Sequence, residues 1–129
     1  MNGVPMEQKK ILIADDETEV LEILEKRLKE SGYALKAVSK GKDALDACKQ
    51  EKFDLIVLDI AMPDMDGYTV AENLRQDKQL QNIPIIFLTG KELEYKGVQK
   101  RIEELGAYDF LIKPCTFEEI LSKIKEAIG

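Results

Sequence analysis

The sequence contains no histidine and only two cysteines in 129 residues. The lack of histidine removes the commonest general base, the Ser-His and Cys-His catalytic pairs, and the usual ligand of transition metals. Cys48 and Cys115 show no CxxC spacing, which favours two reduced thiols over a metal site or a disulfide. Any chemistry must therefore come from Asp, Glu, Lys, Thr or Ser side chains.

Long apolar runs are also missing. No stretch approaches the length of a membrane-spanning helix, and residues 1–10 lack the apolar segment of a signal peptide. We therefore expect a cytoplasmic protein without a membrane span. The chain has no Ser/Gly-rich linker and no low-complexity segment, so we expect one domain over residues 9–129, preceded by a flexible lead-in over residues 1–8.

Basic residues are fewer than acidic residues. Lys and Arg number 19 against 25 Asp and Glu, which gives a formal net charge of −6. The acidic residues are spread along the chain, and this distribution argues against direct binding of nucleic acid.

Short apolar runs alternate with amphipathic segments. The runs at 11–14, 55–58, 85–88 and 110–112 are continuous, as in strands covered on both faces, whereas residues 34–39 alternate and favour an edge strand. Helical spacing of apolar residues follows each run, most clearly in the last helix, where Thr116 and Glu119 have the spacing of a capping box. This order predicts an α/β fold, a doubly wound five-stranded parallel sheet in the flavodoxin-like order 2-1-3-4-5 with helices on both faces.

Polar residues follow four of the predicted strands. In such a sheet, ligands bind beyond the carboxyl ends of the strands, where the strand order reverses. An aspartate after a strand is by itself a common helix cap, and a single lysine or threonine there is ordinary. The convergence of several such residues on one edge predicts a site, and the residues are Asp15, Asp16, Asp59, Thr89 and Lys113.

Three carboxylates at one edge need compensation. Two carboxylates about 5 Å apart repel by roughly 3 kcal/mol at an effective dielectric constant of about 20. Lys113 supplies one positive charge, and a divalent cation with oxygen ligands would supply more. Few carboxylates with open water positions favour Mg²⁺ over Ca²⁺, and the absence of His and Cys from the cluster disfavours zinc. A carboxylate beside Mg²⁺ and lysine can attack phosphorus, so we expect Asp59 to be phosphorylated.

The chain resembles the receiver domain of two-component response regulators over about residues 9–128. The matching segments are ILIADD (11–16), LIVLDIAMPDMDG (55–67), IIFLTG (85–90), GA (106–107) and DFLIKP (109–114). The resemblance implies that Asp59 is the phosphoacceptor and that Asp15 and Asp16 hold Mg²⁺ together with the backbone carbonyl of Ala61. It also implies that Lys113 pairs with the phosphoryl group and that a cis peptide bond precedes Pro114.

Two further positions are implied to take part in a switch. Thr89 resembles the hydroxyl residue that turns toward the phosphoryl group, and Phe110 occupies the position of the switch aromatic residue. Because Phe110 cannot donate a hydrogen bond, a switch there works by packing alone. The alternative for Phe110 is an ordinary packed aromatic residue of the last strand.

The resemblance implies a phosphorylation-controlled signalling switch rather than a turnover enzyme. The phosphoryl donor would be a histidine kinase or a histidine phosphotransfer protein, and the output an unknown protein target. Two alternatives stay open: a Mg²⁺-dependent phosphohydrolase of the haloacid-dehalogenase type, and a receiver-like binding module that is not phosphorylated. The phosphohydrolase would need a second aspartate two residues after the nucleophile, where this chain has Ala61.

Overall fold

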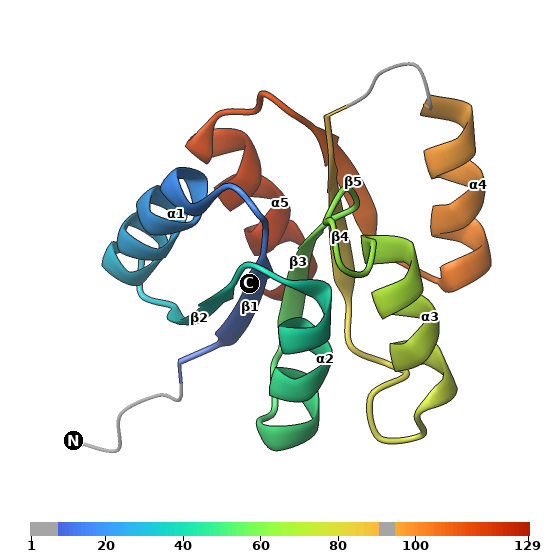
Figure 1. Ribbon diagram of the computed structural model, residues 1–129. Coiled ribbons are helices and arrows are strands. Elements are labelled where there is room, and N and C mark those ends of the chain that lie inside the picture. The colour runs from blue at the N-terminus through green and yellow to red at the C-terminus, as the bar shows by residue number, and fades with distance from the viewer. Residues whose placement is uncertain (1–7, 91–94) are drawn as a thin grey trace.

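The computed structural model describes residues 8–90 and 95–129 (Figure 1). Nearly all of the lead-in expected over residues 1–8 lies outside the described residues. Five parallel strands form one sheet in the order β2-β1-β3-β4-β5, which confirms the predicted topology. The strands are β1 (Lys10–Ala14), β2 (Ala34–Val38), β3 (Leu55–Asp59), β4 (Ile85–Thr89) and β5 (Asp109–Ile112).

A helix follows each strand, and the helices cover both faces of the sheet (Figure 1). Helices α1 and α5 lie on one face, and α2, α3 and α4 lie on the other. Their bounds are α1 (Thr18–Glu30), α2 (Gly41–Gln50), α3 (Gly67–Gln76), α4 (Tyr95–Leu105) and α5 (Phe117–Ile128). No helix in the described part of the chain has the length and apolar character needed to span a membrane.

Two apolar layers lie against the two faces of the sheet. In β1, Leu12 and Ala14 pack toward α2 and α3, while Ile11 and Ile13 pack toward α1 and α5. The central strands β3 and β4 are buried along their whole length, whereas every residue of β2 and β5 is only half-buried. The continuous runs at 11–14, 55–58 and 85–88 and the alternating run at 34–39 therefore have the burial predicted for them. The prediction is wrong for the run at 110–112, which was expected to be covered on both faces, because β5 is the second edge strand of the sheet and is half-buried.

Local signals set several helix ends as expected. Gly32 and Gly106 follow α1 and α4 with φ of 100° and 63°, conformations in which a side chain would be strained. In α5, the Thr116 hydroxyl accepts from the Glu119 N–H, and the Glu119 carboxylate accepts from the Thr116 N–H, both at 3.1 Å. This confirms the predicted capping box.

Candidate functional site

The register of the sheet brings the polar strand ends together. Ala14 pairs with Leu58, so that the next residues in the chain, Asp15 and Asp59, are neighbours beyond β1 and within β3. On the other side of β3, Asp59 pairs with Leu88, the residue before Thr89. The sheet thus places the carboxylates of β1 and β3 at the point where the strand order reverses, as predicted.

Lys113 reaches the same point from β5. Thr89 pairs with Ile112, and the Lys113 N–H donates to the Thr89 carbonyl at 2.6 Å. The peptide bond between Lys113 and Pro114 is cis, as the resemblance implied. Thr89, the last residue of β4, is buried and only 6% exposed.

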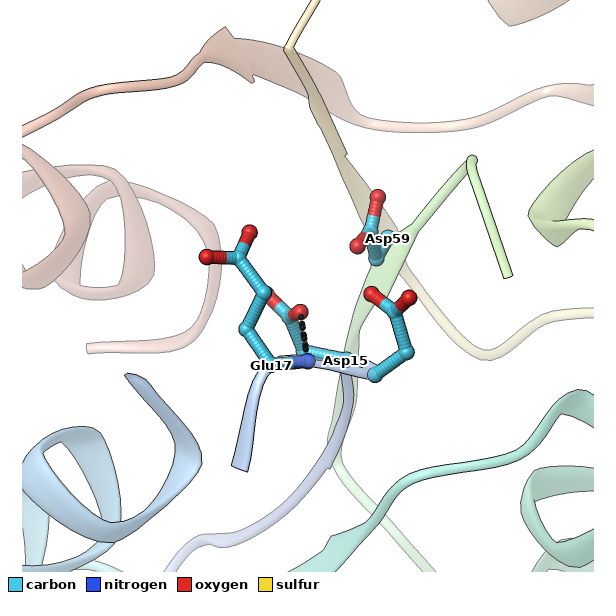
Figure 2. A group of neighbouring side chains, drawn as sticks. Asp15, Glu17 and Asp59 are labelled. Atoms are coloured by element: carbon cyan, nitrogen blue, oxygen red, sulfur yellow. Dashed lines mark hydrogen bonds between the residues drawn. The ribbon is translucent and has the colours of Figure 1, made fainter. Parts of the chain in front are cut away.

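Four acidic side chains gather at this edge. Asp15, Asp16, Glu17 and Asp59 each offer one carboxylate oxygen, and these four oxygens lie within 4.8 Å of one another. Asp15 and Asp59 are buried, whereas Asp16 and Glu17 are exposed. Figure 2 shows Asp15 and Glu17 at the end of β1 beside Asp59 of β3. The cluster therefore has a buried floor and a solvent-facing rim.

Asp15 forms part of the floor. Its Oδ1 accepts from the Glu17 N–H at 2.9 Å, an interaction that shapes the turn before α1. Its Oδ2 is buried and lies 2.7 Å from Lys113 Nζ, but it accepts no well-aligned hydrogen bond from the described residues. A buried carboxylate oxygen that accepts no hydrogen bond is available to coordinate a cation.

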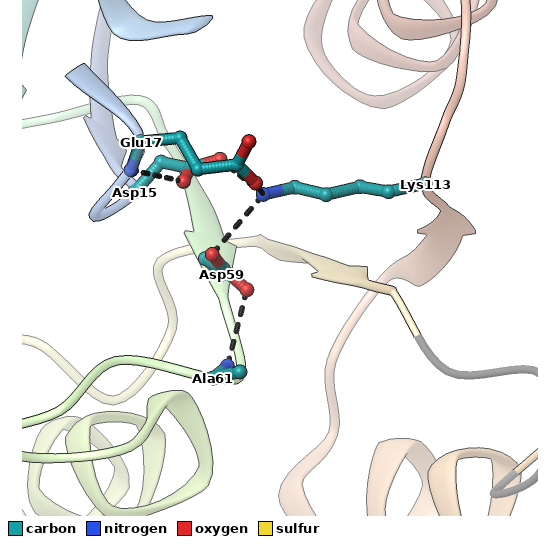
Figure 3. Close-up of polar contacts among 5 residues, drawn as sticks. All are labelled: Asp15, Glu17, Asp59, Ala61 and Lys113. Carbon is teal, nitrogen blue, oxygen red and sulfur yellow. Dashed lines mark hydrogen bonds and ion pairs between the residues drawn. The ribbon is translucent and has the colours of Figure 1, made fainter.

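Lys113 is the positive centre of the cluster (Figure 3). Its Nζ lies 2.7 Å from Asp15 Oδ2, 2.9 Å from Glu17 Oε1 and 3.1 Å from Asp59 Oδ2. Burial acts to lower the pKa of Lys113, but its contacts with Asp15 and Glu17 and the charge of Asp59 raise the pKa above its ordinary value. The ammonium group therefore stays charged at neutral pH.

Asp59 is held at both carboxylate oxygens. Oδ1 accepts from the Ala61 N–H at 3.1 Å, and Oδ2 accepts from Lys113 Nζ at 3.1 Å (Figure 3). Burial, followed by the charge of Asp15, raises the pKa of Asp59 to about 6, although Lys113 and the Ala61 N–H oppose the rise. Asp59 is therefore ionised at pH 7 against an electrostatic penalty that a cation would relieve.

Tight packing fixes the segment after Asp59. Gly67 leaves no room for a side chain, because an added Cβ would lie 2.5 Å from the Asp59 carbonyl oxygen. The Asp64 carboxylate accepts from the Gly41 and Lys42 N–H groups at 3.0 and 3.1 Å, and so caps α2 from this segment. Ala61 is exposed at its start, beside the carboxylate cluster.

Phe110 lies at the edge of the sheet. It pairs with Phe87 in the register of β4 and β5, is half-buried, and packs against the layer that contains α3 and α4. This position is compatible with either a switch residue or an ordinary packed aromatic residue.

Glu17 is a member of the cluster that the sequence reasoning missed. It immediately follows the acidic pair, and the only signal for it was a third consecutive acid at the end of β1. It is also the N-cap residue of α1, and its side chain makes no capping hydrogen bond. The side chain turns to Lys113 instead.

Comparison with known proteins identifies the family of this chain. The family described as the response regulator receiver domain matches residues 11–125. The chain belongs to this family. It is 41% identical over 117 residues to the alkaline phosphatase synthesis transcriptional regulatory protein PhoP of Bacillus subtilis, covering 91% of this chain and 47% of that protein. A probable transcriptional regulator, ycf27 of Porphyridium aerugineum, is 38% identical over 125 residues, covering 95% of this chain and 49% of that protein.

This receiver domain thus spans about half the length of the curated relatives that it matches. Among solved structures, the chemotaxis response regulator CheY4 of Vibrio cholerae superimposes with a TM-score of 0.86 at 26% identity, covering 94% of this chain and 99% of that chain. The receiver domain of the sensor histidine kinase PA1611 from Pseudomonas aeruginosa, solved with magnesium coordinated in its active-site cleft, has a TM-score of 0.83 at 26% identity and covers 95% and 99% of the two chains.

The donor set of this receiver domain fits a hard divalent cation. All four clustered side chains offer carboxylate oxygen, and one buried oxygen, Asp15 Oδ2, has spare accepting capacity. Neither cysteine belongs to the cluster. Oxygen ligands on an open rim are typical of a Mg²⁺ site that keeps several waters.

Proposed function

We propose that this receiver domain is a phosphorylation-controlled switch in which Asp59 accepts a phosphoryl group with the help of Mg²⁺. The observation that carries the proposal is the contact of one buried carboxylate, Asp59, with a lysine ammonium on one side and an acidic cluster on the other. Asp15, Asp16, Asp59 and the Ala61 carbonyl would hold the cation. When bound, Mg²⁺ would neutralise the cluster and the charge on the phosphoryl oxygens.

In the transfer step, an Asp59 carboxylate oxygen forms a bond to phosphorus while the bond from phosphorus to the donor breaks. The leaving group keeps the electron pair, and an imidazole leaving group takes up a proton. Lys113 stabilises the negative charge on the phosphoryl oxygens during this step. Since these 129 residues contain no histidine, the donor would be a phosphohistidine outside them, on a histidine kinase or a histidine phosphotransfer protein.

The product adds about two negative charges beside Lys113 and Thr89. Thr89 ends β4, directly after the residue that pairs with Asp59, and its hydroxyl would turn toward the phosphoryl group. Movement there would be passed to Phe110, which lies on the neighbouring strand, and so to the surface that a downstream protein binds. The domain would then act as a signalling element and not as a turnover enzyme.

The phosphohydrolase alternative has less support. It calls for a general acid two residues after Asp59, where Ala61 offers no titratable group, and none of the comparisons favours it. A receiver fold that does not accept phosphate would not need the buried, electrostatically unfavourable Asp59.

The test is incubation with acetyl phosphate and Mg²⁺, followed by intact mass spectrometry. We expect the mass of one added phosphoryl group on the wild-type protein, and no addition on Asp59→Asn or in the presence of a chelator. Equal modification of Asp59→Asn would refute the assignment of Asp59. Continuous release of product from an aromatic phosphate ester would instead support the phosphohydrolase.

A further inference from the structure

Glu17 makes a contact that its position in α1 does not require. It is the N-cap residue of the helix, yet its side chain caps no N–H group. Instead its Oε1 accepts from Lys113 Nζ at 2.9 Å, from a residue 96 positions away (Figure 3). The Glu17 side chain is 58% exposed, so the contact lies on the solvent-facing rim of the acidic cluster.

This contact completes a ring of carboxylates around the lysine. Lys113 Nζ donates hydrogen bonds to Glu17 and Asp59, and it lies 2.7 Å from Asp15 Oδ2 without an aligned hydrogen bond to that oxygen. An anion that binds at Asp59 would therefore compete with these carboxylates for the ammonium group. Asp15 is fully buried and tied to the turn before α1, and Asp59 is itself the anchor of the anion, whereas Glu17 is free to move into water.

We propose that Glu17 is a positioning residue that sets the balance of the site between cation and phosphoryl group. As a carboxylate of the cluster, it raises the affinity for a divalent cation. As a competitor for Lys113, it lowers the affinity for a phosphoryl group at Asp59. This inference rests on the proposed function of the site. It adds a residue that raises the affinity for the cation and lowers the affinity for the phosphoryl group.

A matched control lies on the same helix. Glu19 is in the first turn of α1, is exposed, and makes no side-chain ion pair or hydrogen bond with the residues that the structure describes. Glu17→Gln and Glu19→Gln remove the same charge at nearly the same distance from the N-terminus of α1. A difference between the two variants therefore reports the contact with Lys113 and not the general charge of the helix.

The test uses the whole chain and two probes. Magnesium chloride alone is titrated by calorimetry, and trifluoroberyllate, a phosphoryl-like anion, is titrated at saturating Mg²⁺ and followed by fluorine NMR. For Glu17→Gln we expect Mg²⁺ affinity to fall and trifluoroberyllate affinity to rise, each by about three- to tenfold, whereas Glu19→Gln changes each by less than about twofold. Glu17→Asp keeps the charge but shortens the reach, so it should keep the wild-type Mg²⁺ affinity and still bind the anion more tightly.

The outcomes separate this inference from the proposed function. If the wild-type protein binds neither probe, or if Asp59→Asn binds trifluoroberyllate as well as the wild type, the proposed function fails. If the wild type binds both probes but Glu17→Gln equals Glu19→Gln, only the role of Glu17 fails. A loss of affinity for both probes in Glu17→Gln would indicate a merely structural residue and would also overturn the inference, as would a Glu17→Asp protein that binds the anion no more tightly than the wild type.

Discussion

Lys113 Nζ lies 3.1 Å from Asp59 Oδ2, although 54 residues separate the two in the chain. The distance follows from the sheet register. Asp59 and Thr89 end the neighbouring strands β3 and β4, and Lys113 directly follows β5, the strand next to β4. The same ammonium also contacts Asp15, which follows the strand on the other side of β3. One positive charge thus links three of the five strands at the edge where the sheet reverses its order.

Replacement of Lys113 by Gln should destabilise the protein in the absence of metal. It leaves the buried carboxylates of Asp15 and Asp59 without their positive partner, and we expect the free energy of unfolding at pH 7 to fall by about 3 kcal/mol. The measurement is urea unfolding in a chelating buffer. Added Mg²⁺ should restore part of the loss, because the cation replaces the missing charge.

Lys123→Gln is the matched control. Lys123 also contacts two carboxylates, Asp109 at 2.7 Å and Glu126 at 3.5 Å, but these acids are 36% and 56% exposed. Such partly exposed pairs contribute less than about 1 kcal/mol. Equal losses in the two lysine variants would show that burial of the Asp15 and Asp59 carboxylates does not set the energy of the Lys113 contacts.

The pKa of Asp59 predicts a pH-dependent gain in stability for Asp59→Asn. Because this pKa is about 6 in the folded protein and 3.8 in its ordinary environment, the folded state holds the proton more strongly between these two pH values. The free energy of unfolding of the wild type therefore falls as pH rises from about 4 to about 6, and stays reduced above that range. At about 1.4 kcal/mol for each pKa unit, the reduction is of the order of 3 kcal/mol.

Asp59→Asn lacks this titration. In metal-free buffer we expect the variant to be more stable than the wild type by about 2 kcal/mol at pH 7, since an amide fits the site less well than a neutral carboxyl group. The difference should shrink toward zero at pH 4, where the wild-type side chain is protonated. Urea unfolding of both proteins from pH 4 to pH 8 checks this, and a difference that does not vary with pH would contradict the raised pKa.

The sequence was sufficient to predict the order of the strands and most of the site. The continuous apolar runs of β3 and β4 reflect burial on both faces of the sheet, whereas the alternating run of β2 reflects less complete burial. The end of each run also indicates which polar residue lies at the end of the strand. In a parallel sheet the carboxyl ends share one edge, so Asp15, Asp59 and Lys113 had to be neighbours. The burial of β5 was not predicted, because its run at 110–112 is as continuous as those of β3 and β4 although the strand lies at an edge of the sheet.

The contacts that were missed depend on two distant segments. Nothing in the segment around Glu17 indicates that a lysine 96 positions later in the chain lies within reach of its side chain. Helix α2 begins at Gly41, where its first N–H groups are capped by Asp64 of another segment and not by a local side chain. Caps that come from elsewhere in the fold leave no spacing pattern in the sequence.

Gly41→Ala should be strongly destabilising, whereas Gly97→Ala should be stabilising. A Cβ at Gly41 would overlap the Met65 carbonyl oxygen and lie 2.9 Å from the Met65 Cβ, so the segment after Asp59 would have to move. We expect a loss of about 2 kcal/mol or more. At Gly97, on the exposed face of α4, an added Cβ meets nothing within 4 Å, and alanine should add about 0.5–1 kcal/mol.

Thermal and urea unfolding of the two glycine variants check this pair. The same substitution thus has opposite signs at two helical positions, because only one of them faces a packed backbone. A stable Gly41→Ala protein would mean that the segment between Asp59 and α3 yields easily, and the fixed position of Ala61 relative to Asp59 would then need another explanation.

The two cysteines should differ in their reactivity with a thiol reagent such as dithionitrobenzoate. Cys48 is a buried residue of α2, and burial raises its pKa to about 11, so it should react only when the protein unfolds. Cys115 is partly exposed beside Lys113, and burial together with the charge of Glu119 raises its pKa above the ordinary value. At pH 8 we expect one thiol per protein, that of Cys115, to react slowly in the folded protein and the second to react only in denaturant.

Cys115→Ala should abolish the reaction of the folded protein, and Cys48→Ala should leave it unchanged. A folded Cys115→Ala protein that still reacts at the wild-type rate would contradict the burial of Cys48.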